Sequence, residues 1–187
     1  GQPMPTLYIA GPEVFLPDAA AVMGEKRRIA ARYGFAVTGP GPEENANPTT
    51  EVKTARGIYL TDRRMMLEAE YCLANITPFR GVSADVGTVY EIGFMIAAGR
   101  RVWAYSNDPR PYGARVWSEW YRQEGPQEMA GADGFAIETY GLADNLMIDC
   151  GVAEHGGQVI RPDAPVADPD RDLASYTRAL VLMAGSA

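Results

Sequence analysis

Residues 71–94 read YCLANITPFRGVSADVGTVYEIGF, and this stretch is the most informative part of the sequence. The apolar run 71–74 has the length and composition of a buried strand, and a loop containing Pro and Gly leads from it into a helix that begins near Asp85. A strand that is followed by a loop and a helix is the repeating unit of a parallel sheet. A carboxylate at the carboxyl end of such a strand, beside a helix start, lies where α/β folds bind their ligands.

Asp85 and Glu91 are the two acids of this stretch. They are six residues apart, so on one continuous helix their side chains would point roughly 240° apart. They can face a common ligand only if Asp85 belongs to the loop or the helix cap and Glu91 lies inside the helix. Gly87 and Gly93 flank Glu91 and leave room for a ligand or another backbone to approach.

The alternation of strands and helices extends along the chain. The predicted strands are residues 7–12 (ending in a tight turn), 35–38, 71–75 and 101–105, with a fifth beginning at 135–137. The predicted helices are residues 19–33, 52–69 (capped by Thr50), 86–98, 114–123 and 172–183. Residues 39–48 predict a loop over the site, and residues 140–147 an extended run with Asn145 and Met147 on the same side. We therefore expect one α/β domain over residues 1–187, a doubly wound flavodoxin-like or Rossmann-like parallel sheet of about five strands with flanking helices.

Composition excludes several classes of protein. The chain has 187 residues, 47% of them apolar, which suits a globular fold with a sizeable core. Its net charge of −7 argues against a nucleic-acid surface, which would need a basic stripe. No apolar stretch approaches the ~18 residues of a membrane span. The N-terminus does not read as a secretory signal and the two cysteines suit a reduced compartment, so we expect a cytoplasmic enzyme.

The sequence predicts neither a metal nor a cofactor. One histidine and two distant cysteines cannot supply the usual zinc ligands. A Ser-His-Asp arrangement would have to use His155, which lies in a glycine-rich stretch that we expect to be exposed. No phosphate-binding loop is present, and the first strand ends in Ala-Gly-Pro-Glu (residues 10–13) rather than in a dinucleotide fingerprint.

Acids and aromatic residues near strand ends remain as candidates for chemistry: Tyr8, Glu13, Asp62, Asp85 and Glu91. Each has an alternative structural explanation. Tyr8 could belong to the core, Asp62 could be a solvated charge beside two arginines, and Asp85 could only cap a helix. Glu91 is harder to dismiss, because its helix is apolar around much of its circumference and a carboxylate there is costly unless it is paired or functional.

Three segments, in this order, resemble the nucleoside 2-deoxyribosyltransferase family. They are LYIAGPEVF (residues 7–15), NITPFRG, DVGT and EIG within residues 75–93, and YGLADNLM (residues 140–147). The resemblance implies that Glu91 is the nucleophile, that Asp85 holds the sugar or orients Glu91, and that Tyr8 hydrogen-bonds to Glu91. It also implies that Asp62 handles the proton of the leaving base.

The same resemblance implies substrate contacts from Gly11 and Phe15. Asn145 and Met147 would close the sugar pocket, in this family typically from a neighbouring subunit, so we expect a homo-oligomer with a shared site. The substrates would be a nucleoside and a nucleobase, with no cofactor, nucleic acid or membrane involved. Two features depart from the family: Glu70, eight residues after Asp62, stands where Asp is more usual, and residues 107–134 form a longer region that could reshape the base pocket.

The residue types suit this chemistry. An N-glycosidic bond breaks through an oxocarbenium-like state that a carboxylate stabilises and can trap as a glycosyl-enzyme. Two alternatives remain open. One is an N-glycosidase that hydrolyses a nucleoside or a nucleoside 5′-monophosphate, for which Ser83 is the candidate phosphate contact. The other is a non-catalytic nucleotide-sensing module on the same scaffold.

Overall fold

The computed structural model describes residues 3–41 and 54–186. Its centre is a parallel sheet of five strands in the order β2-β1-β3-β4-β5. The strands are β1 (Thr6–Tyr8), β2 (Ala36–Gly39), β3 (Tyr71–Asn75), β4 (Arg101–Tyr105) and β5 (Val159–Ile160). This flavodoxin-like order confirms the predicted fold class, and the order reverses at β1 and β3.

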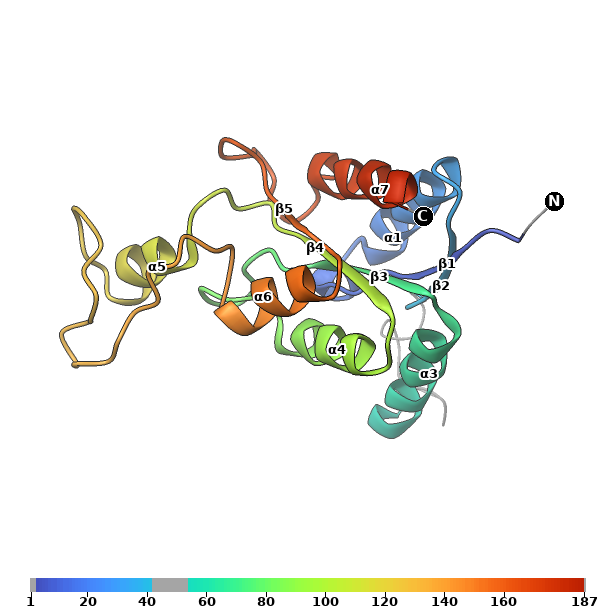
Figure 1. Cartoon of the computed structure of the whole chain (residues 1–187), viewed down its shortest axis with the longest axis horizontal. Coiled ribbons are helices and arrows are strands. Elements are labelled where there is room, and N and C mark those ends of the chain that lie inside the picture. Colours follow the sequence, from blue (N-terminus) through green and yellow to red (C-terminus); the bar gives the residue numbers. More distant parts are fainter. Residues whose placement is uncertain (1–2, 42–53, 187) are drawn as a thin grey trace.

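Helices cover both faces of the sheet (Figure 1). One face carries α1 (Ala19–Arg32) and α7 (Ala174–Ser186). The other carries α3 (Ala55–Glu68), α4 (Val86–Ala97) and α6 (Leu146–Glu154). Crossovers through helices are what parallel neighbours require, because a hairpin cannot join strands that run in the same direction.

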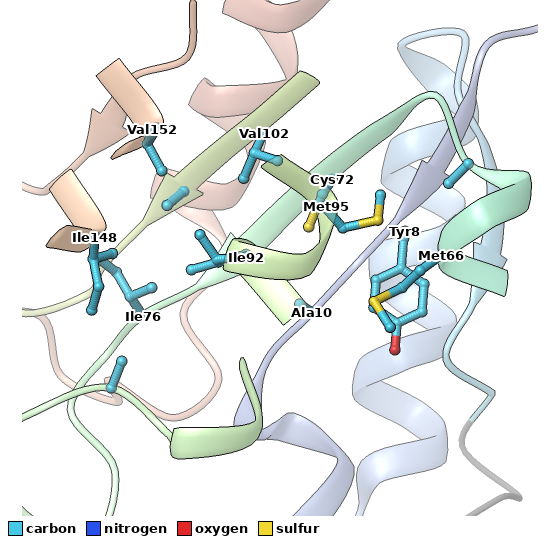
Figure 2. Packing of buried hydrophobic residues seen from close by; sticks show 14 of the residues in the cluster. Tyr8, Ala10, Met66, Cys72, Ile76, Ile92, Met95, Val102, Ile148 and Val152 are labelled. Atoms are coloured by element: carbon cyan, nitrogen blue, oxygen red, sulfur yellow. The ribbon is translucent and has the colours of Figure 1, made fainter. Parts of the chain in front are cut away.

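Two apolar cores lie on the two faces. The first joins β1, β3 and β4 to α3, α4 and α6; Tyr8 and Met66 lie at one end of it and Ile148 and Val152 at the other (Figure 2). The second packs α1 and α7 against the opposite side chains of the same strands. Every residue of β3 is buried, which explains why the strand reads as a continuous apolar run instead of alternating.

Two predicted elements are wrong. Phe135–Ile137 is not a sheet strand: Ala136 only bridges Ala130 in an antiparallel pair, and the fifth strand is β5. Residues 140–147 do not form one extended run either, because Asn145 caps α6 and Met147 lies inside its first turn. The helix predicted from residue 52 is described from Ala55 with Thr54 as its cap, while Thr50 lies outside the described residues.

A long connection between β4 and α6 leaves the body of the molecule. It contains α5 (Tyr112–Arg115), the π-helical turn η3 (Val116–Trp120) and a loop to about residue 140, coloured yellow to orange in Figure 1. This segment corresponds to the predicted insertion at 107–134. It extends away from the sheet. None of its described residues lines the candidate site pocket, which is described below.

Candidate active site

A pocket of about 280 Å³ opens at the carboxyl ends of β1 and β3, the switch point at which open α/β sheets bind ligands. Its size lies near the lower end of the range for small-molecule sites, roughly 300–1,000 Å³. Six of the eight predicted site residues line it together: Tyr8, Gly11, Phe15, Asp62, Asp85 and Glu91.

Glu91 and Tyr8 both line this pocket and are hydrogen-bonded to each other. Tyr8, the last residue of β1, is fully buried, and its hydroxyl donates a hydrogen bond to Oε2 of Glu91 on α4. Burial raises the pKa of Glu91 to about 7; the bond from Tyr8 lowers it, and the charge of Asp85 raises it further. The pKa of Tyr8 is raised by burial and then by the nearby carboxylates of Glu91 and Asp62, so its hydroxyl stays a proton donor.

Asp85 meets the geometric condition set by its spacing from Glu91. It is the N-cap of α4, and its Oδ2 accepts hydrogen bonds from the backbone N and from Oγ1 of Thr88, at 3.0 and 2.9 Å. Within residues 3–41 and 54–186, no hydrogen bond occupies its Oδ1. The carboxylate therefore caps the helix and faces the same pocket as Glu91.

Asp62 reaches the pocket from α3, on the side opposite α4. It is half-buried rather than a fully solvated surface charge, and its charge acts on the pKa of Tyr8. Tyr59 lies one turn earlier on α3, and its hydroxyl is 3.3 Å from that of Tyr90 on α4. Both tyrosines line the pocket, so an aromatic pair joins its two helical walls.

Gly11 and Phe15 belong to the turn after β1, which includes the 3-10 helix η1 (Pro12–Phe15). A Cβ on Gly11 would lie 2.1 Å from Oε2 of Glu13 and 2.9 Å from Cβ of Asn75, so a larger residue there would displace the packing of the turn. Phe15 is half exposed and stacks on Phe79 with ring centroids 5.5 Å apart. The turn thus places an aromatic ring at the rim of the pocket.

Sequence reasoning did not find the buried ion pair beneath this turn. Lys26 of α1 is fully buried and lies 2.7 Å from Oε1 of Glu13. The same oxygen accepts hydrogen bonds from Asn75 at the end of β3 and from Tyr105 at the end of β4, at 2.6 and 3.0 Å. A signal was available, because Lys26 shares the helical spacing of the buried positions Met23 and Ala30 on α1.

The remaining predicted residues lie apart from the pocket. Asn145 caps α6 by accepting from the N–H of Met147, and its amide donates to Glu138 at 2.9 Å. Met147 is 75% exposed, and neither residue lines the pocket of its own chain. Glu70 is exposed at the opposite, amino end of β3, where its backbone N–H bonds to Thr6.

Other candidate centres are not assembled in the described residues. His155 is exposed at the end of α6, and its ring bonds to the carbonyl of Gly151. No group of three acid, histidine or cysteine side chains in the described part of the chain could hold a metal ion. No helix there has the length and apolar character to cross a membrane.

Comparisons with known proteins bear on this arrangement. A family model described as nucleoside 2-deoxyribosyltransferase matches residues 7–147. An uncharacterized protein of Schizosaccharomyces pombe is 28% identical over 172 residues, which cover 83% of this chain and 81% of that protein. A solved 2-desoxiribosyltransferase from Leishmania mexicana is 26% identical with a TM-score of 0.60, covering 95% of this chain and 97% of that one. A conserved protein from Enterococcus faecalis shares the fold at 20% identity and a TM-score of 0.58, over 96% and 99% of the two chains. With the family model matching most of its length, this chain belongs to the nucleoside 2-deoxyribosyltransferase family.

Proposed function

We propose that this protein transfers a 2-deoxyribosyl group from one nucleobase to another through a covalent bond to Glu91. The family acts on nucleosides and nucleobases, and the match supports an enzyme of this class. One observation carries the finer proposal: the Glu91 carboxylate, bonded by a buried tyrosine hydroxyl, shares a pocket with Asp85 and Asp62. A nucleophile, its orienting donor and two further acids are what N-glycosidic bond exchange needs.

In the first half-reaction, an oxygen of Glu91 attacks C1′ of the bound nucleoside as the bond from C1′ to the base nitrogen breaks. The oxocarbenium-like charge that develops is stabilised by the same carboxylate. Asp62 delivers a proton to the departing base, which leaves neutral. Tyr8 donates to Oε2 and so orients the carboxylate for attack.

In the second half-reaction, a nitrogen of an incoming base attacks C1′ and releases Glu91 as a carboxylate. The incoming base gives up a proton, which Asp62 accepts, so the protein returns to its starting state. Each step inverts C1′, and the overall result is retention. Asp85 is suited to a sugar hydroxyl, because its cap bonds occupy Oδ2 and leave Oδ1 to accept.

A neighbouring subunit would complete the site. Met147 is largely exposed and, with Asn145, lies at the start of α6 outside the pocket of its own chain. We propose that this end of α6 covers the sugar site of a second copy in a homo-oligomer. Such a cover would exclude water, which would otherwise divert the glycosyl-enzyme to free sugar.

The charge of the pocket argues for an uncharged nucleoside rather than a 5′-monophosphate. Three carboxylates line it, and no lysine or arginine appears among its described lining residues. A phosphate would meet the negative charge of Asp85 and Glu91, and the described lining residues offer no compensating cation. Ser83, the candidate phosphate contact, does not line the pocket.

Incubation with a 2′-deoxynucleoside, with and without a second free base, tests the proposal. Chromatography should show a new nucleoside only when the second base is present, and Glu91→Gln should show none. Free deoxyribose without a new nucleoside would instead identify a hydrolase. An unchanged substrate, bound or not, would favour a sensing module.

A further inference from the structure

Arg115 is a fully buried cation at the end of α5. Its guanidinium donates hydrogen bonds to three backbone carbonyls, those of Val82, Arg110 and Ala143, at 3.0, 2.9 and 2.7 Å. These carbonyls belong to three separate loops. Arginine is seldom fully buried without a partner, and here its planar fork links segments that are distant in the sequence.

Asp144 supplies the opposite charge. It is also buried, and its Oδ2 lies 3.8 Å from Nη2 of Arg115. That oxygen accepts a hydrogen bond from the backbone N–H of Ala84 at 2.8 Å, and Oδ1 accepts one from Asn145 at 2.8 Å. Burial lowers the pKa of Arg115 and raises that of Asp144, so each charge needs the other.

The two residues hold the loop that leads into the Asp85 cap. Arg115 donates to the carbonyl of Val82, and Asp144 accepts from the backbone N–H of Ala84. Asp85 is the next residue after Ala84, and its carboxylate accepts hydrogen bonds from Thr88 in the first turn of α4. Neither Arg115 nor Asp144 lines the pocket, so neither can touch a substrate bound there by this chain.

We propose that Arg115 and Asp144 form a clamp that positions Asp85 for the reaction. The inference rests on the proposed function for the part that Asp85 plays, although the clamp itself is defined by the contacts above. Because the clamp also holds Ala143 and Asn145, it ties the Asp85 loop to the start of α6. The alternative is a purely structural role, in which the pair anchors α5 to the rest of the domain and has no effect on Asp85.

The test is a double-mutant cycle that combines Arg115→Lys with Asp85→Ala. Lysine keeps the charge but cannot serve three carbonyls with a planar fork. If the clamp acts through Asp85, Arg115→Lys should lower kcat/KM roughly ten-fold or more in the otherwise unchanged protein. In the Asp85→Ala background the same substitution should have little further effect, because the two changes are coupled. Equal fold-losses in both backgrounds would overturn the proposal.

Backbone hydrogen exchange gives a readout that needs no substrate. Arg115→Lys should speed the exchange of the Ala84 and Thr88 amides in the folded protein. Arg161→Lys is the matched control, because Arg161 also donates to a loop carbonyl, that of Gly141 at 3.1 Å, and has no hydrogen bond to residues 82–88 within the described chain. Unchanged exchange at both amides would contradict the clamp.

A second variant covers the case in which Arg115→Lys does not fold. Asp144→Asn keeps the side-chain shape and an acceptor oxygen but removes the charge, and it should give the same coupling to Asp85 and the same faster exchange. If the unmodified protein neither transfers nor hydrolyses, the proposed function fails. The exchange measurements then still decide whether the clamp exists.

Discussion

At Glu91, burial and hydrogen bonding act on the pKa in opposite directions. Burial dominates and raises the pKa to about 7, while the Tyr8 hydroxyl, which bonds to the charged form, lowers it. A nucleophile must be ionised, so kcat/KM should rise with pH through a midpoint near 7. The pKa of Glu91 on α4 is thus held close to neutral pH by burial and by the hydroxyl of Tyr8 from β1.

Removing the Tyr8 hydroxyl should move this midpoint. Tyr8→Phe leaves the ring in place but takes away the donor that stabilises the carboxylate, so the pKa of Glu91 should rise. A hydrogen bond to a charged group corresponds to a shift of roughly one to two pH units. The pH profile of kcat/KM measures it, with Tyr59→Phe as a control that changes a pocket tyrosine not bonded to Glu91. A midpoint that stays in place or falls would show that the bond does not tune Glu91.

The effect of Asp62→Asn on the rate of base release should depend on how good a leaving group the base is. An asparagine cannot deliver a proton, so poor leaving bases should be released much more slowly, while activated bases that leave as anions should lose little. Rates for a series of nucleosides of graded base acidity give the comparison. A uniform loss across the series would assign Asp62 a structural role.

Local sequence singled out part of the site, while the resemblance to the family was needed to add Tyr8 and Asp62 and to suggest a role for each residue. Glu91 stood out as a carboxylate in an apolar helix, and Asp85 as an acid where a helix begins. The Glu13–Lys26 pair was missed, because it joins side chains from two elements and only the fold brings them together. For Asn145 the helix cap outweighed the extended pattern that the sequence suggested.

The turn after β1 is held by packing at Gly11. Gly11→Ala would place a methyl group against Oε2 of Glu13 and 2.9 Å from Cβ of Asn75, which must shift the turn that carries Phe15. We expect a loss of about 1–3 kcal/mol in the free energy of unfolding and a rise in KM. Urea unfolding and steady-state kinetics measure these two effects.

Gly24→Ala provides the control for this element. Gly24 lies within α1, where a Cβ would meet only Arg28 Nη1, at 3.6 Å. Alanine there should stabilise the helix by about 0.5–1 kcal/mol and leave KM unchanged. If both substitutions had the same effect, the packing account of Gly11 would be wrong.

Element boundaries were predictable where burial was continuous. The bounds of β3 and β4 were obtained from the sequence because each is an apolar run that ends in a turn or loop. β5 was misplaced because two residues carry too little pattern to be recognised. α6 was missed because its buried positions, Ile148, Asp149 and Val152, include an acid that bonds to the preceding loop.

In the assembled protein, we expect two copies of the chain to share each site. Glu91→Ala and Asn145→Ser should each be inactive alone; serine keeps a cap for α6 but lacks the amide. After subunit exchange, an isologous dimer should recover roughly a quarter of the unmodified activity, because half of the dimers carry one intact site. Native mass spectrometry checks the exchange. Verified mixed dimers without activity would mean that each chain works alone.

The proposed reaction passes through a covalent sugar on Glu91, and this intermediate can be trapped. The protein is mixed with a 2′-deoxynucleoside without acceptor base, quenched in acid, and analysed by intact and peptide mass spectrometry. We expect added mass equal to the deoxyribosyl group on the peptide that contains Glu91. This mass should be absent from Glu91→Gln, whose turnover should fall by at least ~10³-fold. A label on another residue, or base exchange that persists in Glu91→Gln, would contradict it.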